Sequence, residues 1–194
     1  MNDMNADAVS TALVAHRAAM DSIASAADSI VEAAALIADS LAAGGQVLFC
    51  GNGGSAADAQ HFAAEFVGRY LKERRPWPAL ALSTNSSAVT AIANDYGYAD
   101  VFARQVEAHG RSGDVLVAIS TSGGSENCVR AVAAARGIGM RVVTMTGGDG
   151  GALALDCDVN LNVASPATPR IQEGHVFMGH VVCGLVEERL CSTP

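Results

Sequence analysis

Apolar residues recur at helical spacing in the first part of the chain. Between residues 5 and 43 they lie three or four positions apart, as at Ala8, Ala12 and Ala15, which predicts one or two helices. Gly44-Gly45 then provides the stop signal that commonly ends a helix. No strand pattern accompanies this segment, so we expect a helical arm that packs on another surface, such as a partner subunit.

The rest of the chain alternates short apolar runs with helical patterns. Strands and helices in this order, with crossovers of this length, predict an α/β fold with a doubly wound, five-stranded parallel sheet. The predicted strands are Gln46–Cys50, Ala79–Leu82, Asp114–Ile119, Arg141–Met145 and Asp158–Val163. The predicted helices lie near 55–71, 86–109, 125–137 and 150–155, and a last one begins at Thr168-Pro169, as N-cap and first helical residue, and ends near Leu190.

The length and charge of the chain narrow its class. Its 194 residues suit one structural domain, in which we expect residues 1–44 to form the arm and residues 45–194 the α/β domain. Half of the residues are apolar, so a sizeable core is available and wholesale disorder is excluded. The 12 Lys and Arg against 20 Asp and Glu give a net charge of −8, which argues against a general nucleic-acid binder.

The compartment follows from the N-terminus and the cysteines. Residues 1–7 are polar and acidic, unlike a secretory signal, and no run of about 18 apolar residues predicts a membrane span. The five cysteines are scattered, odd in number and never spaced as C-x-x-C, so we expect reduced thiols rather than disulfides or a zinc finger. We therefore expect a cytoplasmic protein.

A glycine-rich segment, Gly51-Asn-Gly-Gly-Ser-Ala56, directly follows the first predicted strand. Ligands of such sheets bind beyond the carboxyl ends of the strands, where glycines admit a ligand and free helix N–H groups favour an anion. The segment also matches the loose dinucleotide pattern G-x-G-x-x-A, but the second strand ends Leu82-Ser-Thr-Asn85, without the carboxylate that binds the ribose. A turn that only packs strand against helix is the structural alternative.

A hydroxyl-rich segment, Ser120-Thr-Ser-Gly-Gly-Ser125, follows the third predicted strand. Hydroxyls, turn amides and a helix N-terminus can surround a phosphate without a lysine. Further hydroxyls at Ser83, Thr84, Ser86 and Ser87 follow the second strand, which favours a phosphate site along this edge. The alternative is a plain helix cap made by Ser122 or Ser125.

His61 and Glu65 lie four positions apart in one predicted helix, and therefore one turn apart on the same face. An imidazole and a carboxylate can bind a metal or carry protons. The same spacing continues from Glu65 to Arg69, so a solvated, salt-bridged face is the alternative. His180 lies in the apolar run Val176–Val182 of the last helix, where a buried core histidine is the alternative to a ligand.

Four segments carry a family resemblance: Cys50–Val67 (CGNGGSAADAQHFAAEFV), Ala91–Ala99 (AIANDYGYA), Ala118–Ser125 (AISTSGGS) and Arg170–Glu187 (RIQEGHVFMGHVVCGLVE). Together they resemble the phosphoheptose isomerases, or sedoheptulose 7-phosphate isomerases, within the sugar isomerase (SIS) fold, which is flavodoxin-like. The similarity extends over nearly the whole chain. The combination is highly specific, although each segment alone is not.

The resemblance implies a site, residue by residue. It implies one zinc ion per subunit, bound by His61, Glu65, Gln172 and His180, with Glu65 and His180 also forming the catalytic acid/base pair. It implies substrate-binding roles for Asn52, Gly53, Gly54, Glu65, Asn94, Asp95, Ser120, Thr121, Ser122, Ser125 and Gln172. It also implies a homotetramer with active sites near subunit interfaces, which would give the N-terminal arm its partner.

The implied activity is the conversion of sedoheptulose 7-phosphate to D-glycero-D-manno-heptose 7-phosphate through an enediol. The resemblance therefore implies a role in heptose biosynthesis. It leaves open whether the heptose enters lipopolysaccharide, another surface polysaccharide or a natural product. One alternative is a non-enzymatic scaffold of the same fold, like the replication-initiator-associating proteins, which lack the equivalents of Glu65 and His180. Another is a sugar-phosphate-sensing module, which is weakened because the chain has no basic helix-turn-helix segment.

The serine loop departs from the family pattern at Gly123-Gly124, where a Gly-Asn or Gly-Lys pair is commoner. We expect this change to alter the flexibility of the loop, because glycine is the least restricted residue. It leaves the matched hydroxyls in place.

Overall fold

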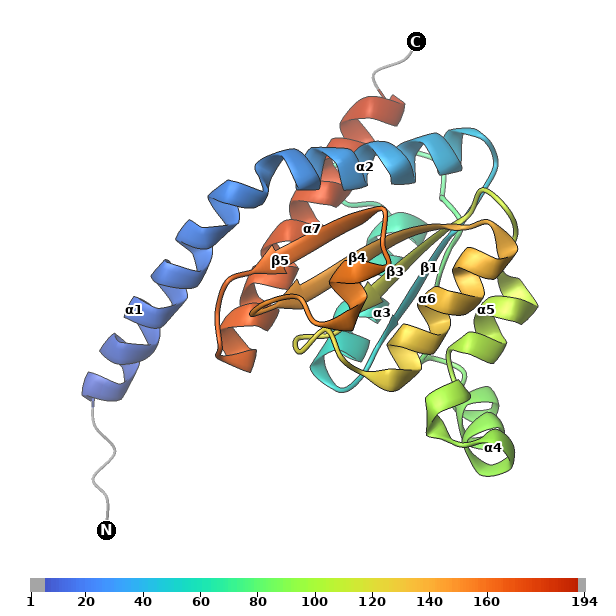
Figure 1. Cartoon of the computed structure of the whole chain (residues 1–194). Helices are drawn as coiled ribbons and strands as arrows, with labels where there is room; N and C mark the ends of the chain where they lie inside the picture. The colour runs from blue at the N-terminus through green and yellow to red at the C-terminus, as the bar shows by residue number, and fades with distance from the viewer. Residues whose placement is uncertain (1–5, 192–194) are drawn as a thin grey trace.

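Five parallel strands form the centre of the fold in the computed structural model, which describes residues 6–191 (Figure 1). Their bounds are β1 Val47–Gly51, β2 Ala79–Ala81, β3 Val115–Ile119, β4 Arg141–Gly147 and β5 Val159–Val163. The strand order is β2-β1-β3-β4-β5, with every neighbouring pair parallel. This is the doubly wound, flavodoxin-like order, so the fold class predicted from the sequence is confirmed.

Helices connect the strands and cover both faces of the sheet. Their bounds are α1 Ala6–Ile23, α2 Ala27–Ala42, α3 Gly54–Val67, α4 Ser86–Tyr96, α5 Ala103–His109, α6 Glu126–Ile138 and α7 Thr168–Cys191, with short 3-10 turns η1 Ala24–Ala26, η2 Tyr98–Asp100 and η3 Ala152–Leu155. Along residues 6–191, none of these helices is long and apolar enough to cross a membrane.

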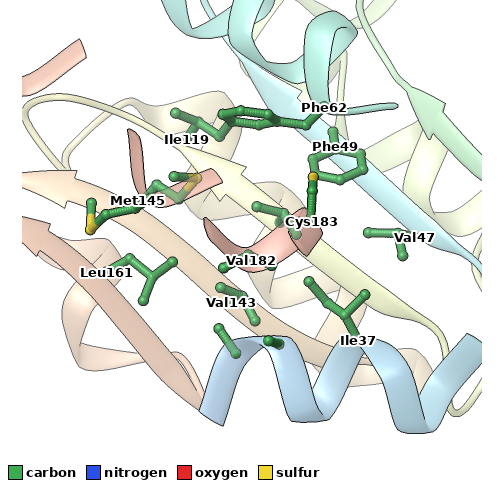
Figure 2. Close-up of a cluster of buried hydrophobic side chains, with 14 of the residues drawn as sticks. Ile37, Val47, Phe49, Phe62, Ile119, Val143, Met145, Leu161, Val182 and Cys183 are labelled. Carbon is green, nitrogen blue, oxygen red and sulfur yellow. The ribbon is translucent and has the colours of Figure 1, made fainter. Parts of the chain in front are cut away.

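Alternate residues of the strands supply two separate cores. Phe49 of β1 joins the core beneath α2, α3 and α7, whereas its neighbour Leu48 joins the core beneath α5 and α6. Figure 2 shows the first core, in which Phe49 and Leu161 of the sheet face Ile37 of α2 and Val182 of α7. Because the central strands are buried on both faces, they consist of continuous apolar runs, which is why the sequence predicts them.

Of the two helices of the N-terminal arm, α2 packs against the rest of the domain and α1 is mostly exposed. α2 buries one face against α7 and the sheet, but α1 buries only Ala19 and Ile23 and runs out past β5 at its N-terminal end (Figure 1). Val9, Leu13 and Val14 on α1 are 63%, 49% and 65% exposed. The arm therefore presents an apolar face that no other part of residues 6–191 covers.

Three predicted helices differ from the structure at their bounds, and the one predicted near 150–155 is only the 3-10 turn η3. The predicted helix 86–109 is two helices, because Gly97 adopts a φ of +98° that ends α4. α3 ends at Val67, followed by Gly68, rather than near residue 71. Thr168 is already helical, and the carbonyl of Ala167 accepts the first bond of α7 from the N–H of Ile171.

Candidate functional site

The glycine-rich and serine-rich segments lie side by side at the carboxyl edge of the sheet. Gly51 of β1 pairs in register with Ile119 of β3, so the residues that follow leave adjacent strands together. The strand order reverses here, between β1 and β3, and such a reversal opens a crevice for ligands. Gly53 has a φ of +55° at the start of α3, a conformation that favours glycine.

The hydroxyls of the serine loop contact one another. Ser120, which is 3% exposed, has its Oγ 2.9 Å from that of Ser125 and 3.4 Å from that of Ser122. Ser125 occupies the N-cap position of α6 but makes no capping bond, and Ser122 accepts the N–H of Gly124 instead. The loop is therefore a cluster of hydroxyls at a helix N-terminus rather than the plain helix cap that was the alternative.

The glycine pair of this loop has two different roles. Gly123 has a φ of +63°, and a Cβ there would collide with the carbonyl of Gly150, so only glycine fits. Gly124 has its nearest neighbour, the Ser122 Oγ, 3.8 Å from where a Cβ would lie, so a larger residue fits. The departure from the family pattern thus falls at the permissive position.

Next to the serine loop lies a hollow of about 250 Å³. Thr121 and Ser122 form one wall, and the turn Gly147–Asp149 with Ser165, Pro166 and Thr168 forms the others. The hydroxyls of this lining and the N-terminus of α7 beside it suit an anionic group such as a phosphate, whereas the Asp149 carboxylate opposes one.

Asn52 is held by a reciprocal amide pair. Its Nδ2 donates to the Oδ1 of Asn127 at 2.9 Å, and its Oδ1 accepts from the Asn127 Nδ2 at 2.8 Å and from the Tyr98 hydroxyl at 3.0 Å. Asn94 and Asp95 lie exposed on α4, where the Asn94 amide donates to the Asp95 carboxylate. Sequence reasoning missed Asn127 and Tyr98, because no local pattern links them to Asn52.

His61 and Glu65 of α3 and His180 of α7 form a cluster that could bind a metal ion. Their ligand atoms all lie within 4.8 Å of one another. The Nε2 atoms of His61 and His180 are 2.7 Å apart, and the Nδ1 of His61 lies 3.6 Å from the Glu65 carboxylate. The side chains of His61 and Glu65 are 41% and 20% exposed, so the group is open to a ligand.

α3 and α7 bring this group together because they run side by side in the same direction. The amide of Gln172 on α7 lies against Gly54 at the start of α3, where a Cβ would have to displace it. His180 lies eight residues after Gln172 on α7, and His61 lies seven residues after Gly54 on α3. Each helix therefore rises about 10–12 Å between its first contact and the histidine pair. The Gln172 amide therefore lies against Gly54, at the other end of the helix contact from the two histidines.

The two histidines of α7 have opposite environments. His175 is fully buried, donates from Nε2 to the carbonyl of Thr146 at 2.9 Å, and has no partner for Nδ1 within residues 6–191. Burial lowers the pKa of His175 to about 4, so it is neutral near pH 7. His180 is half-buried and faces the open group, so the core-histidine alternative predicted for it is wrong, and the buried histidine of α7 is His175 instead.

Asp58 lies one turn before His61 on α3 and is half-buried. Its Oδ2 has no hydrogen-bond partner in the described part of the chain. Burial raises the pKa of Asp58 to about 6, and the charge of His61 opposes this shift. Arg69 pairs with Glu73 at 3.6 Å, beyond the end of α3, so Glu65 faces His61 rather than continuing a salt-bridged stripe.

Comparisons with known proteins place the chain among sugar-phosphate enzymes. The family model described as "SIS domain" matches residues 11–147. The phosphoheptose isomerase of Rhodospirillum rubrum is 58% identical over 86% of this chain and 88% of its own length. That of Helicobacter pylori is 48% identical over 93% of this chain and 95% of its own.

Solved structures agree with the sequence comparisons. The phosphoheptose isomerase of Neisseria gonorrhoeae superimposes with a TM-score of 0.89 at 46% identity, covering 94% of this chain and 98% of that one. The similarity thus includes the arm as well as the sheet domain.

Proposed function

Because the chain belongs to the phosphoheptose isomerase family of SIS-domain proteins, we propose that it converts sedoheptulose 7-phosphate to D-glycero-D-manno-heptose 7-phosphate. The observation that carries the mechanism is the meeting of Glu65 and His180, which lie 115 positions apart in the chain and have their polar atoms within 4.8 Å. The protein is an aldose–ketose isomerase.

Glu65 and His180 carry the protons of the reaction. Conversion of the ketose removes a proton from C1, passes through a cis-enediol, and returns a proton to C2 while the oxygens exchange theirs. Each transfer needs a base or acid about 3 Å from the reacting atom, and a carboxylate and an imidazole are the two side chains best suited to this work. The openness of the group leaves room for C1 and C2 of the sugar beside them.

His61, Glu65 and His180 fit a zinc ion by their donor set. Two imidazole nitrogens and a carboxylate oxygen are typical zinc ligands, and three protein ligands leave a position for substrate. We propose one zinc ion per subunit, bound by these three residues. The amide of Gln172, the fourth ligand that the resemblance implies, lies against Gly54, about 12 Å along α7 from His180, so in this conformation Gln172 does not join the other three. When bound, zinc supplies a Lewis acid that polarises the substrate carbonyl.

The phosphate binds at the serine loop, through Ser120, Thr121, Ser122 and Ser125 and the N-terminus of α6. Its distance from the reacting carbons makes it an anchor that orients the sugar. Asn52, Gly53, Gly54, Asn94, Asp95 and Gln172 are the candidates for the sugar hydroxyls. The positions of Gly53, Gly54 and Gln172 at one sheet edge support this role.

A homotetramer would cover the apolar arm. Between α1, α2 and α7 runs an apolar groove of about 470 Å³, whose lining includes Met20, Val31 and Phe177. Phe177 is 50% exposed, and a single chain of this length rarely leaves such a groove uncovered. We propose that residues 1–44 are the oligomerisation arm and that the active sites lie near the subunit interfaces, as the family resemblance implies.

Light scattering tests the oligomer. Phe177→Glu places a charge in the groove and should reduce the mass from four chains to fewer. Leu155→Glu is the matched control, because Leu155 is 89% exposed on η3, away from the groove. A Phe177→Glu protein that keeps the full mass would contradict this interface.

The compartment and pathway complete the proposal. The five cysteines are free, which suits a reducing cytoplasm. The heptose product suits the biosynthesis of lipopolysaccharide or another heptose-containing glycan.

Two experiments test whether the protein isomerises the sugar phosphate through Glu65 and whether it binds zinc through His61. Glu65→Gln should abolish turnover of sedoheptulose 7-phosphate while calorimetric binding of the sugar phosphate persists, and Glu73→Gln, at an exposed carboxylate, should behave as wild type. Wild-type protein that binds the sugar but never isomerises it would favour the scaffold or the sensor. Metal analysis should find zinc that His61→Ala loses, and an enzyme indifferent to zinc would remove the metal from the proposal.

A further inference from the structure

The loop between α3 and β2 is tied to α7 by one buried carboxylate. Glu187, 1% exposed, accepts the backbone N–H groups of Tyr70, Leu71 and Lys72 at 2.8–2.9 Å and the Nε of Arg74 at 2.9 Å. Three consecutive N–H groups on one carboxylate determine the path of the loop. The loop has neither helix nor strand of its own, so its conformation depends on this attachment.

Arg74 ties the same loop to the end of α3. Its guanidinium, on a side chain 4% exposed, donates to the carbonyl of Glu65 at 2.7 Å and to that of Phe66 at 2.9 Å. It also lies over the ring of Trp77, 3.6 Å from the centroid. Arg74 and Glu187 thus clamp together the helix that carries His61 and Glu65 and the helix that carries His180.

The clamp places an aromatic ring on His180. Tyr70, whose N–H is bound by Glu187, stacks its ring on the imidazole with centroids 5.4 Å apart and planes 19° apart. The His61 ring lies nearly perpendicular to the same imidazole, with centroids 4.9 Å apart and an angle of 81° between the ring planes. His180 is therefore bounded by two rings, and its rotation about the Cα–Cβ and Cβ–Cγ bonds is restricted.

We propose that Tyr70 is a positioning residue, which keeps the His180 imidazole turned toward His61 and Glu65 and is itself fixed by the Glu187–Arg74 clamp. This inference rests on the proposed function, in which His180 moves a proton. A proton carrier that turns away loses rate steeply, and a misplacement of about 1 Å can cost about 100-fold. The tyrosine acts through the histidine and need not touch the sugar.

Kinetics of three variants test the ring. Tyr70→Ala keeps the N–H that Glu187 binds but removes the stack, and should lower kcat about ten-fold or more with KM changed less than about two-fold. Tyr70→Phe restores the ring and should return kcat to within about two-fold of wild type. Leu71→Ala is the matched control, because Leu71 has the same backbone anchor and a side chain that is 71% exposed.

The same variants have a readout that does not depend on turnover. Proton NMR of the protein as isolated, with His180 assigned by His180→Gln, should show an NOE between the ring protons of His180 and His61 that is lost in Tyr70→Ala and kept in Tyr70→Phe, because the two imidazoles are in contact only when His180 is turned toward His61. Wild-type kcat in Tyr70→Ala, an equal loss in Tyr70→Phe or Leu71→Ala, or an NOE that persists in Tyr70→Ala would each overturn the inference. An inactive wild type would defeat the proposed function alone, and the NMR result would still decide whether Tyr70 orients His180.

Discussion

The Glu187 clamp gives the most quantitative test of the structure. Replacing Glu187 with glutamine keeps the shape of the side chain and removes its charge. The carboxylate is buried and accepts four hydrogen bonds, three from backbone N–H groups of residues 70–72 and one from Arg74. An amide has one oxygen, so it can keep about half of these bonds, and its NH₂ group faces the remaining donors.

The expected loss of stability follows from these contacts. Removing one partner of a buried ion pair costs about 3–5 kcal/mol, and each buried donor left without an acceptor costs about 1–3 kcal/mol. The two figures describe the same carboxylate and overlap, so we expect Glu187→Gln to lower the free energy of unfolding by about 3–5 kcal/mol. A typical domain has only about 5–15 kcal/mol in total.

The loss should depend on pH in a defined direction. Burial raises the pKa of Glu187, but hydrogen bonds from Leu71, Tyr70, Lys72 and Arg74 outweigh it, and the pKa lies below its ordinary value. The carboxylate therefore stabilises the fold fully above its unfolded pKa of about 4.3, and this contribution disappears as pH falls through the lower folded value. The difference between wild type and Glu187→Gln should shrink below about pH 4.

Urea denaturation at one protein concentration measures this difference. The single tryptophan, Trp77, is buried beneath Arg74 and reports directly on the clamp. Glu188→Gln makes the same chemical change at the exposed neighbouring position and should stay within about 0.5 kcal/mol of wild type. A loss below about 1 kcal/mol, a loss equal to that of Glu188→Gln, or a loss that grows on acidification would refute the reasoning.

Three further predictions concern the site and the core. Ser122→Asp sets a carboxylate against the phosphate and should raise KM at least about ten-fold in steady-state assays, whereas an unaltered KM would count against the serine loop. Burial holds the pKa of His175 near 4 against about 6.5 unfolded, so acidification from pH 7 to 4.5 should cost wild type about 2–3 kcal/mol in urea titrations, a loss that His175→Gln should not show. Gly179→Ala drives a Cβ into the ring of Phe62 and should cost about 1–3 kcal/mol, whereas Gly137→Ala, with open space around it, should not destabilise; equal thermal midpoints would contradict this.

Part of the candidate site could be predicted from residue types and their spacing along the chain. His61 and Glu65 share a helix face whatever surrounds them, because the helical period alone puts residues four apart together. The hydroxyls of Ser120–Ser125 follow a strand, and ligands of parallel sheets bind at that edge. The pairing of these residues with His180, and the sugar itself, came from resemblance to a family, since spacing along the chain says nothing about a partner more than 100 residues away.

Tyr70, Asn127 and Glu187 were not identified from the sequence. Tyr70 lies in a loop whose path is set by a carboxylate more than 100 residues later, so no local pattern marks it as a neighbour of His180. Asn127 reads as an ordinary residue of a first helical turn, and its bonds to Asn52 depend on the register of β1 and β3. Glu187 looks like one more acidic residue near a helix end until its burial is known.

The sequence by itself determined the succession of strands and helices along the chain. The spacing of apolar residues, with a period of two in strands and 3.6 in helices, and the glycines that end helices are local properties of the sequence. It could not decide which histidine of α7 is buried and which is exposed to a ligand. His175 and His180 lie five residues apart and so point in different directions around the helix, and only the packing of α7 on the sheet turns one to Thr146 and the other to His61. The tertiary structure decided this because burial is a property of what a helix packs against, and not of the helix alone.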